Sequence, residues 1–446
     1  MTHPLYARWP MWLKPSGTWK NWAGNQRCAP ATVERPQNEQ ELVAAVVRAA
    51  EAGRTVKATG AGHSFTSVAC TDGTLIDLAG YQRVLAVDRH RCMVKVQAGI
   101  TLAALNDALA TEGLALENLG DIAYQSVAGA TATGTHGTGL RFRNMSSAIV
   151  GMRLVDGDGK LVDCSADHHA DLLSAARVGI GALGIASEIT LRCVPAFNLH
   201  AVEEPARIDD VLERLDELVE GNDHYELFWV PGTRWALTKR NRRTDEAPRP
   251  RPRWQAFRND TMVDNVGFGV VQRVGVRRPD LIPRLARWLP STGRQEYVDR
   301  SDRVFASKRW VRFVEMEYAV PRAAFPSAFA AVRRLVTRLG EPIGFPVECR
   351  FVAGDDIPLS TASGRDTAYI AVHLAVGRPY DQYFQGVEAI MDDHEGRPHW
   401  GKLHFQSAAT LAPRYPGWDE FQAVRRRLDP AGRFANPYTD WVLGAV

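Results

Sequence analysis

The stretch that decides the fold is Thr59-Gly60-Ala61-Gly62-His63-Ser64-Phe65-Thr66, in which a short strand expected over 55–58 runs into a turn with two glycines. Glycine adopts positive φ and has no Cβ, so the backbone can bend sharply and approach another molecule closely. Successive N–H groups of such a turn can converge on an anion such as a pyrophosphate. An ordinary strand-to-loop turn would use the same glycines, so this stretch alone leaves both interpretations open.

A second segment of this kind runs from Gly129 to Gly139 (GATATGTHGTG). Small residues and hydroxyls packed so densely are costly in a core unless something polar lies against them. A bound phosphate and a flexible loop both account for this composition. Two such segments in one part of the chain favour the phosphate.

A third glycine segment, Gly179-Ile180-Gly181-Ala182-Leu183-Gly184, matches GxGxxG literally. The dinucleotide fingerprint needs a strand before it and a helix after it. Here a helix is expected before it, over 168–178, and a strand after it, over 185–194. The pattern therefore excludes a Rossmann site and predicts glycines that close a helix and let the next strand pack tightly.

Helical and strand periodicities alternate along the chain, which indicates an α+β or α/β protein. Before Pro195 we expect helices over 39–52 and 101–111 and strands over 74–78, 93–96, 149–155 and 161–164. Beyond it we expect helices over 208–218 and 324–339 and strands over 225–230, 312–320, 347–353 and 368–376. The break at Pro195 predicts two α+β domains, 22–195 and 196–446.

Composition bounds the class of protein. The chain has 446 residues, too many for one ordinary core, with 45% hydrophobic and 24% charged residues, as in a soluble globular enzyme. The net charge of +3 argues against a duplex-binding protein. The segment 239–254 (KRNRRTDEAPRPRPRW) is expected to be a basic, proline-rich loop. Nucleic-acid binding through it is a weak alternative, because charge runs are usually solvated faces.

Cysteines and apolar runs bear on the compartment. The six cysteines form no CxxC pair, so no metal site is expected, and free thiols indicate a reducing, cytoplasmic location. Residues 1–15 have no basic start followed by an apolar run, so no signal peptide is expected. No run of about 18 apolar residues exists, so no membrane span is expected.

Charged residues in two expected strands are candidates for chemistry. Glu348 and Arg350 are two apart, so they point to the same face of a strand. A structural cross-strand ion pair would show the same pattern. His373 alternates with apolar neighbours in the next strand, where a half-buried structural histidine is the simpler explanation.

Together with His399-Trp400-Gly401-Lys402 and the block 316–321 (MEYAVP), these segments resemble the vanillyl-alcohol-oxidase type of flavoprotein. Within it they are similar to the aldonolactone oxidoreductase branch and the related alditol oxidases, from about Asn21 to Leu443. The resemblance implies a PCMH-type FAD-binding domain of two α+β subdomains, followed by an α+β substrate (cap) domain. It also implies that the C-terminus, from about His399, returns to the flavin.

The resemblance implies FAD as cofactor. His63 matches the histidine that covalent members bond to the flavin 8α-methyl. Other positions implied to contact the cofactor are Gly60, Ala61, Gly62, Ser64, Gly120, Asp121, Ser126, Gly129, Thr133, Gly134, Thr135, His136 and Ile189. Alditol oxidases tend to carry serine where Asp121 stands, and glycine at position 120 tends to accompany oxidases.

Catalytic roles follow from the same resemblance. Glu348, Arg350 and Lys402 match the family's active-site acid and bases, and His373 matches a nearby histidine. Glu348 would orient the substrate hydroxyl and accept its proton, and Arg350 would keep that carboxylate ionised. Lys402 or Arg350 would stabilise negative charge on the reduced flavin.

The expected function is oxidation of a sugar 1,4-lactone of the L-gulono-, L-galactono- or D-arabinono-type. Its product is a 2-keto lactone that enolises to an ascorbate-type ene-diol, and the electron acceptor is oxygen, a cytochrome or a quinone. An alditol oxidase that makes an aldose and hydrogen peroxide is one alternative. A flavin-binding protein without turnover is another.

Overall fold

The computed structural model describes residues 17–256, 267–282, 293–307 and 311–446. Residues 1–15, on which the expectation about a signal peptide depends, lie outside the described residues. The first long helix shows how local signals act. α1 (Glu39–Glu51) begins where the Asn38 side chain accepts a hydrogen bond from the Glu41 N–H. Its buried residues recur at helical spacing and pack on the first sheet.

The first sheet is small and parallel. Its order is β3 (Thr32–Glu34), β5 (Thr74–Asp77), β4 (Val56–Thr59), and α1 connects β3 to β4. A hairpin of β1 (Trp19–Lys20) and β2 (Arg27–Cys28) precedes it. The 59–66 turn leaves the carboxyl end of β4, and the Trp22 N–H of the hairpin loop donates to Gly62 O at 2.7 Å.

The second sheet is antiparallel, in the order β10 (Leu161–Ser165), β9 (Ile149–Val155), β11 (Ile185–Arg192), β7 (Met93–Gln97), β6 (Val84–Asp88). The helices α2 (Leu102–Thr111), α3 (Val127–Ala132) and α4 (Ala170–Ala176) share its hydrophobic core. Short strands β8 (Leu114–Ala115) and β12 (Val194–Pro195) pair beside it. As predicted, the 179–184 glycines lie between a helix and a strand, and a Cβ on Gly184 would lie 2.7 Å from Val155 O.

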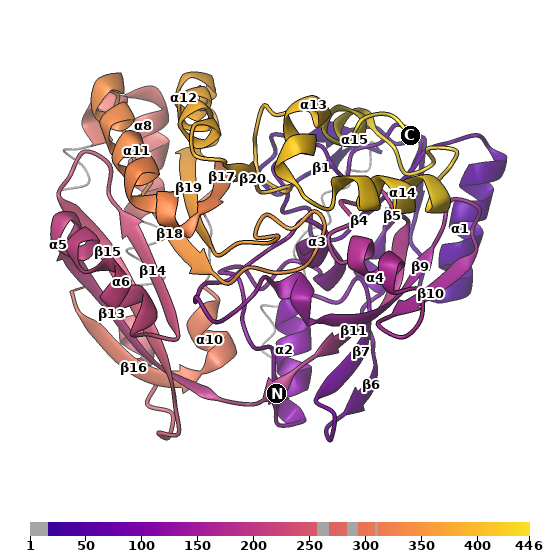
Figure 1. Cartoon of the computed structure of the whole chain (residues 1–446), viewed down its shortest axis with the longest axis horizontal. Helices are drawn as coiled ribbons and strands as arrows, with labels where there is room; N and C mark the ends of the chain where they lie inside the picture. Colours follow the sequence, from indigo (N-terminus) through magenta and orange to yellow (C-terminus); the bar gives the residue numbers. More distant parts are fainter. Residues whose placement is uncertain (1–16, 257–266, 283–292, 308–310) are drawn as a thin grey trace.

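The third sheet has eight strands, ordered β16 (Gln295–Arg300), β13 (Asn198–Arg207), β15 (Trp235–Thr244), β14 (His224–Trp229), β18 (Val347–Val352), β19 (Thr367–Ala375), β17 (Phe313–Pro321), β20 (Arg397–Pro398). All its strand pairs are antiparallel. Helices α5 (Ile208–Glu213), α6 (Leu215–Glu220), α11 (Phe325–Leu339) and α12 (Asp381–Asp392) cover its outer face (Figure 1). The opposite face looks toward the first two sheets.

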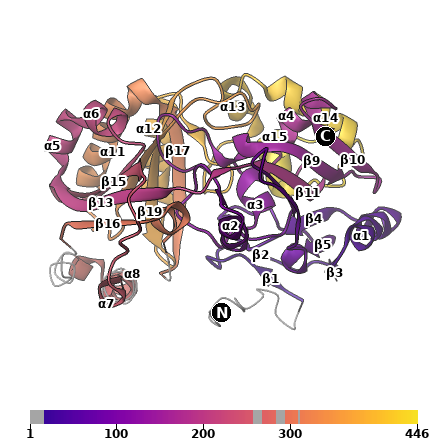
Figure 2. The ribbon, with the colours of Figure 1, turned by 90° about the horizontal axis from the view of Figure 1, so that it is seen from below.

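Further helices lie between β15 and β17 among the described residues. They are α7 (Arg253–Ala256), α8 (Phe268–Arg277) and α10 (Ser301–Phe305). Figure 2 shows α7 and α8 on the side of the eight-stranded sheet, away from α1. No helix among the described residues is both long and apolar enough to cross a membrane.

After β20 the chain returns to the first half of the molecule. α13 (Ala408–Leu411), α14 (Trp418–Leu428) and α15 (Pro437–Leu443) bury apolar residues in the core of the second sheet. Lys57 on β4 donates from Nζ to Phe434 O at 2.9 Å, which ties this segment to the first sheet. The return of the C-terminus is therefore as expected. The boundary at residue 195 stays a prediction.

Two local expectations were wrong. The segment 239–254 is not one loop, because residues 239–244 belong to β15 and 253–256 form α7. The basic residues of β15 fit a strand because acids on the flanking strands pair with them, as Glu204 on β13 pairs with Arg240. The helix expected over 208–218 is broken at Arg214, where φ is −110° and ψ is 19°.

A candidate active site between the sheets

The glycines of the 59–66 turn are required by a close approach to the second glycine segment. A Cβ on Gly60 would lie 2.1 Å from Ser126 Oγ. Ser126 in turn caps α3, and its Oγ accepts from the Gly129 N–H at 3.2 Å. Gly62 has φ of +65°, a conformation that side chains rarely adopt. The two segments predicted to contact one ligand therefore lie side by side.

The segment His399-Trp400-Gly401-Lys402 contacts both glycine segments through Gly401. The Phe65 N–H donates to Gly401 O at 2.7 Å. A Cβ on Gly401 would lie 3.3 Å from both Ser64 Oγ and Thr133 Oγ1. Segments from three distant parts of the sequence thus form one wall.

This wall separates two cavities that share four lining residues, His63, Ser64, Gln125 and Thr133. The smaller, about 110 Å³, lies between the 59–66 turn, α3 and the 180–185 segment. The larger, about 1330 Å³, extends to the eight-stranded sheet. An elongated cofactor with a diphosphate in the glycine-lined part and a ring system in the larger part fits this shape. Lys57 also lines the smaller cavity, and its Nζ donates to Gly181 O at 3.1 Å.

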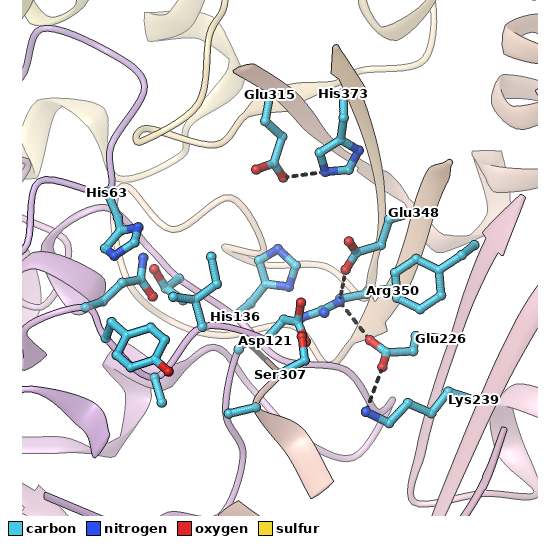
Figure 3. A pocket seen from close by; sticks show the side chains of 18 of the residues that line it. His63, Asp121, His136, Glu226, Lys239, Ser307, Glu315, Glu348, Arg350 and His373 are labelled. Atoms are coloured by element: carbon cyan, nitrogen blue, oxygen red, sulfur yellow. Dashed lines mark hydrogen bonds and ion pairs between the residues drawn. The ribbon is translucent and has the colours of Figure 1, made fainter. Parts of the chain in front are cut away.

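The eight-stranded sheet carries a row of buried charges facing the larger cavity (Figure 3). Glu348 forms an ion pair with Arg350 two residues along β18. Arg350 Nε also lies 3.0 Å from Oε2 of Glu226, its partner across the β14–β18 pair. Lys239 Nζ lies 3.5 Å from the other Glu226 oxygen. Two carboxylates and two cations alternate across neighbouring strands.

The surroundings of Glu348 raise its pKa above the usual value. Burial raises this pKa, and the charges of Glu226 and Asp121 add to the effect, while Arg350 opposes it. Arg350 favours the ionised form of Glu348, although desolvation is the larger effect and the same guanidinium also pairs with Glu226. A carboxyl with a raised pKa is suited to accept a proton near neutral pH.

A second group of charges lies on β17. Lys402 Nζ donates to Glu315 and lies 4.0 Å from Glu317. Burial alone would lower the pKa of Lys402, but these two acids raise it above its usual value. Burial would raise the pKa of Glu315, yet Lys402 and His373 lower it to about 2. The ammonium group is therefore held in its charged form.

His63 lies at the junction of the two cavities. Its ring is 5.5 Å from that of Trp22, centroid to centroid, with 30° between the planes. Burial, and then the charge of Lys402, lower its pKa to about 4. The imidazole is thus neutral at pH 7, as a nitrogen nucleophile must be.

Asp121 lines the larger cavity, and its charge acts on Glu348 and Arg350 of β18 (Figure 3). Ser307, which follows α10, donates from Oγ to Asp121 Oδ1 at 2.8 Å and from its N–H to Asp121 O at 2.9 Å. A residue of the first half of the chain is thereby positioned by the second half.

The structure brings nearly all predicted site residues together. The larger cavity is lined by His63, Ser64, Gly120, Asp121, Thr133, Thr135, His136, Glu348, Arg350, His373 and Lys402. The smaller is lined by Gly60, Ala61, Gly62, Ser126 and Gly129, besides His63, Ser64 and Thr133. Gly134 and Ile189 line neither cavity, and Ile189 is fully buried in the core of the second sheet. Their cofactor contacts stay predictions.

Several residues of the site were missed from the sequence: Lys57, Gly181, Glu226, Lys239, Ser307, Glu315, Glu317 and His399. Glu315 and Glu317 alternate in a strand, as Glu348 and Arg350 do, so the same signal was available. Gly181 lies in the third glycine segment, 179–184, for which a Rossmann site is rejected from the sequence. That rejection was correct, yet the segment still lines the smaller cavity.

Comparisons with known proteins agree with this geometry. Residues 189–442 match the D-arabinono-1,4-lactone oxidase family, and residues 30–165 match the FAD binding domain family. L-gulono-1,4-lactone dehydrogenase of Mycobacterium tuberculosis is 50% identical over 96% of this chain and 100% of its own length. L-gulonolactone oxidase of Bos taurus is 31% identical over 95% and 98%. Alditol oxidase of a Streptomyces species is 32% identical over 94% and 97%.

Solved structures show the same fold. A solvent-stable cholesterol oxidase superposes with a TM-score of 0.79 over 96% of this chain and 98% of its own, at 18% identity. The cholesterol oxidase of B. sterolicum superposes with a TM-score of 0.77 at 17% identity. At these identities the likeness concerns the fold alone.

Proposed function

We propose that this chain, which belongs to the D-arabinono-1,4-lactone oxidase family of FAD-dependent oxidoreductases, oxidises a sugar 1,4-lactone of the L-gulono-, L-galactono- or D-arabinono-type to a 2-keto lactone. The observation that carries the proposal is that Glu348, Arg350 and Lys402 all line the larger cavity, next to the glycine segments that would bind the cofactor. The 50% identity to a protein named L-gulono-1,4-lactone dehydrogenase supports the substrate class.

FAD, when bound, would supply the acceptor for the hydride of the carbinol carbon. The chain supplies the proton chemistry. Glu348 hydrogen-bonds the substrate hydroxyl and accepts its proton, and such a base contributes about a hundred- to ten-thousand-fold in rate. Its raised pKa matches this task, because the carboxylate then has enough basicity to take the proton. Arg350, paired with two carboxylates, orients Glu348.

Lys402 has a different task. Its charge, maintained by Glu315 and Glu317, would stabilise negative charge on the cofactor. A preorganised group of this kind contributes about a hundred- to a thousand-fold in rate. Lys402 follows Gly401, which contacts the 59–66 turn. The position of the Lys402 cation is therefore fixed relative to that turn.

An alditol oxidase is the second candidate, favoured by the 32% identity to a protein of that name. Asp121 argues against it. An acid positioned by two hydrogen bonds from Ser307 stands where alditol oxidases tend to carry serine. A flavin-binding protein without turnover is disfavoured, because it would retain buried charges that cost stability without a use for them.

We also propose that FAD is attached covalently, between a ring nitrogen of His63 and the 8α-methyl carbon. The neutral state of the half-buried imidazole and its place at the junction of the two cavities support this. The matched control is His63→Ala, which removes the nitrogen and leaves the cavity open.

The absorbance spectrum of the flavin, recorded in two experiments, tests both proposals. Purified protein is precipitated with acid, and yellow colour that stays in the pellet, but not in the His63→Ala pellet, supports the covalent bond. L-gulono-1,4-lactone is added anaerobically to an untreated sample, and bleaching of the flavin supports the lactone substrate. Bleaching by xylitol or sorbitol, but by none of the three lactones, would overturn the lactone proposal in favour of the alditol one.

A further inference from the structure

Lys57 has a buried side-chain nitrogen at the smaller cavity. The residue lies on β4, two positions before the 59–66 turn, and only 2% of it is exposed. Its Nζ donates to Gly181 O at 3.1 Å and to Phe434 O at 2.9 Å. All three residues line the smaller cavity. The nitrogen of Lys57 is therefore held between two other residues of the cavity lining.

The segments that hold this nitrogen are fixed by further hydrogen bonds. The C-terminal segment is paired with β4, because the Val56 N–H donates to Arg433 O at 2.8 Å. The third glycine segment is paired with α3, because the Ile180 N–H donates to Ala132 O at 2.9 Å. Lys57 joins these two segments beside the cavity, so its position is set by the packing of distant parts of the chain.

The charged groups around Lys57 do not compensate for its burial. Burial, and then the charge of Arg425, lower its pKa to about 7, although Asp429, Asp440 and Cys70 act in the opposite sense. Asp429 already accepts two backbone N–H groups, and Asp440 lies 3.9 Å from Arg425. In the part of the chain that the structure describes, no ion pair joins Lys57 to an acid. A buried ammonium group without a partner for its charge is costly.

The smaller cavity offers no other side-chain charge to a ligand. Among its described lining residues Lys57 is the one lysine or arginine, and none is acidic. His63 is neutral at pH 7, because its pKa is about 4. The backbone N–H groups of the 59–66 turn can bind a diphosphate, yet they carry no net charge to balance this dianion. A dianion bound here therefore has one side-chain cation available, and that cation is Lys57.

The hydrogen-bonding capacity of Lys57 agrees with a ligand. An ammonium group has three N–H donors. The carbonyls of Gly181 and Phe434 accept from two of them. The remaining N–H is available to an acceptor in the cavity.

We propose that Lys57 binds the diphosphate of FAD through its ammonium group, while the carbonyls of Gly181 and Phe434 position that group. The charge of the buried cation and the charge of the diphosphate then compensate each other. The inference rests on the FAD binding of the proposed function and is independent of which sugar lactone is oxidised. Because Phe434 belongs to the C-terminal segment, the same nitrogen links cofactor binding to the return of the chain.

A purely structural role is the alternative. A neutral amine would also donate to Gly181 O and Phe434 O, and would join the two segments whether or not a cofactor is bound. The two roles differ in how FAD binding responds to pH. A cation binds the diphosphate only in its protonated form, whereas a neutral donor needs no proton.

The dissociation constant of FAD, measured at pH 6, 7, 8 and 9, separates the two roles. The full-length chain carries His63→Ala, so that the flavin can leave, and the fluorescence of FAD released on dilution gives the constant. Lys57→Met removes the charge and keeps the side-chain length, and Lys57→Gln keeps an N–H donor for the carbonyls. Lys95→Met is the matched control, because Lys95 pairs with Glu188 and lines neither cavity.

At pH 6 both Lys57 variants are expected to bind FAD about ten- to a hundredfold more weakly, because a charge-assisted hydrogen bond is lost. Above pH 7 the free amine must take up a proton in order to bind the diphosphate. The dissociation constant of the parent is therefore expected to rise with pH, by up to about tenfold per unit, while that of the variants stays constant. The difference narrows as the pH rises, and the Lys95→Met control follows the parent.

Two results would overturn the proposal. Binding that is weakened by the same factor at every pH would assign Lys57 a structural role. Equal affinity in the parent and in both Lys57 variants would show that the diphosphate does not use this cation. Lys57→Gln gives the answer by itself where Lys57→Met does not fold.

This inference and the lactone proposal fail in different measurements. A flavin that no sugar lactone bleaches would contradict lactone oxidation and leave the pH dependence of FAD binding as expected. A pH-independent difference between parent and variants, in a protein whose flavin a lactone bleaches, would contradict the role of Lys57 alone.

Discussion

The two cavities differ in how their walls are made. The smaller one is lined by short contiguous segments rich in glycine and hydroxyls, and its shape depends on the absence of side chains, as at Gly60. The larger one is lined by charges that come from strands far apart in the sequence, such as Glu226, Glu315 and Glu348. On the proposed function, the smaller cavity binds part of the cofactor by its shape, and the larger one acts through its charges. Mutations should therefore affect cofactor retention in one and turnover in the other.

The largest expected effect is the loss of turnover when charged residues of the larger cavity are replaced. Glu348→Gln is expected to lower kcat by about a hundred- to ten-thousand-fold, because the amide cannot accept the substrate proton. Lys402→Ala is expected to lower it by about a hundred- to a thousand-fold. Steady-state kinetics with lactone measures both. Lys160→Ala, at an exposed ion pair with Asp158, is the control. Unchanged turnover in both variants would remove the catalytic assignment.

Substitutions in the glycine-lined smaller cavity should instead weaken cofactor binding. In Gly60→Ala the new methyl would lie 2.1 Å from Ser126 Oγ, and overpacking of this kind costs about 1–3 kcal/mol. We expect a lower ratio of flavin to protein absorbance after purification. Gly151→Ala, whose Cβ would meet nothing nearer than 3.5 Å, is the control.

A second substitution sharpens this test. Ser126→Gly removes the clashing atoms and, as a residue that also caps helices, costs only a few tenths of a kcal/mol. The double variant Gly60→Ala with Ser126→Gly is therefore expected to recover part of the flavin. Full flavin content in Gly60→Ala alone would mean that the 59–66 turn shifts to accommodate the methyl group without loss of cofactor binding.

Acid should destabilise the fold through buried neutral histidines. Burial lowers the pKa of His224 to about 4 and that of His399 to about 3, whereas an unfolded histidine has a pKa near 6.5. Above pH 6.5 the native state keeps its full stability. As the pH falls toward 4 the unfolded chain binds protons that the native chain does not, at a cost of up to about 3 kcal/mol per histidine.

Urea unfolding at pH 7, 5.5 and 4.5 measures this loss. His224→Phe removes one such group and is expected to flatten the dependence, whereas the exposed His168→Asn should leave it unchanged. An equal slope in all three proteins would show that His224 is not held neutral.

The pH dependence of turnover tests the pairing on the charged wall. Because Glu348 must be ionised to act, kcat/KM is expected to fall on the acid side, with a pKa above that of an ordinary glutamate. Glu226 contributes to the raised pKa, so Glu226→Gln is expected to shift the acid limb to lower pH. The conservative Glu226→Asp should shift it less. An acid limb that does not move would exclude this coupling.

The smallest effect is expected at Gly120, between the two walls. A Cβ there would lie 3.2 Å from both His136 O and Thr135 Cγ2, so Gly120→Ala fits after a shift of a few tenths of an ångström. We expect flavin content and reduction by lactone to stay within about twofold and reoxidation by oxygen to slow. Stopped-flow reoxidation measures it, and unchanged reoxidation would mean that Gly120 does not control oxygen access.

Local signals predicted the first half of the chain well, and the reason is visible at particular residues. α1 starts at a capping Asn38 and ends before Gly53, and both are readable in one dimension. Lys239 shows the opposite. Its sequence context predicts a solvated basic loop, yet Lys239 is a half-buried strand residue because Glu226 on the neighbouring strand pairs with it. Charge alone does not tell exposed from paired.

The sequence by itself determined the motifs, the α+β class, the two glycine segments and the residues Glu348, Arg350 and Lys402, because each depends on neighbours along the chain or on a resemblance in contiguous residues. Only the tertiary structure decided how the charges combine. The direction of the Glu348 pKa depends on burial and on charges from other parts of the chain, such as Glu226 on β14. Desolvation and Coulomb interactions act through space, so they are set only once the sheets have packed.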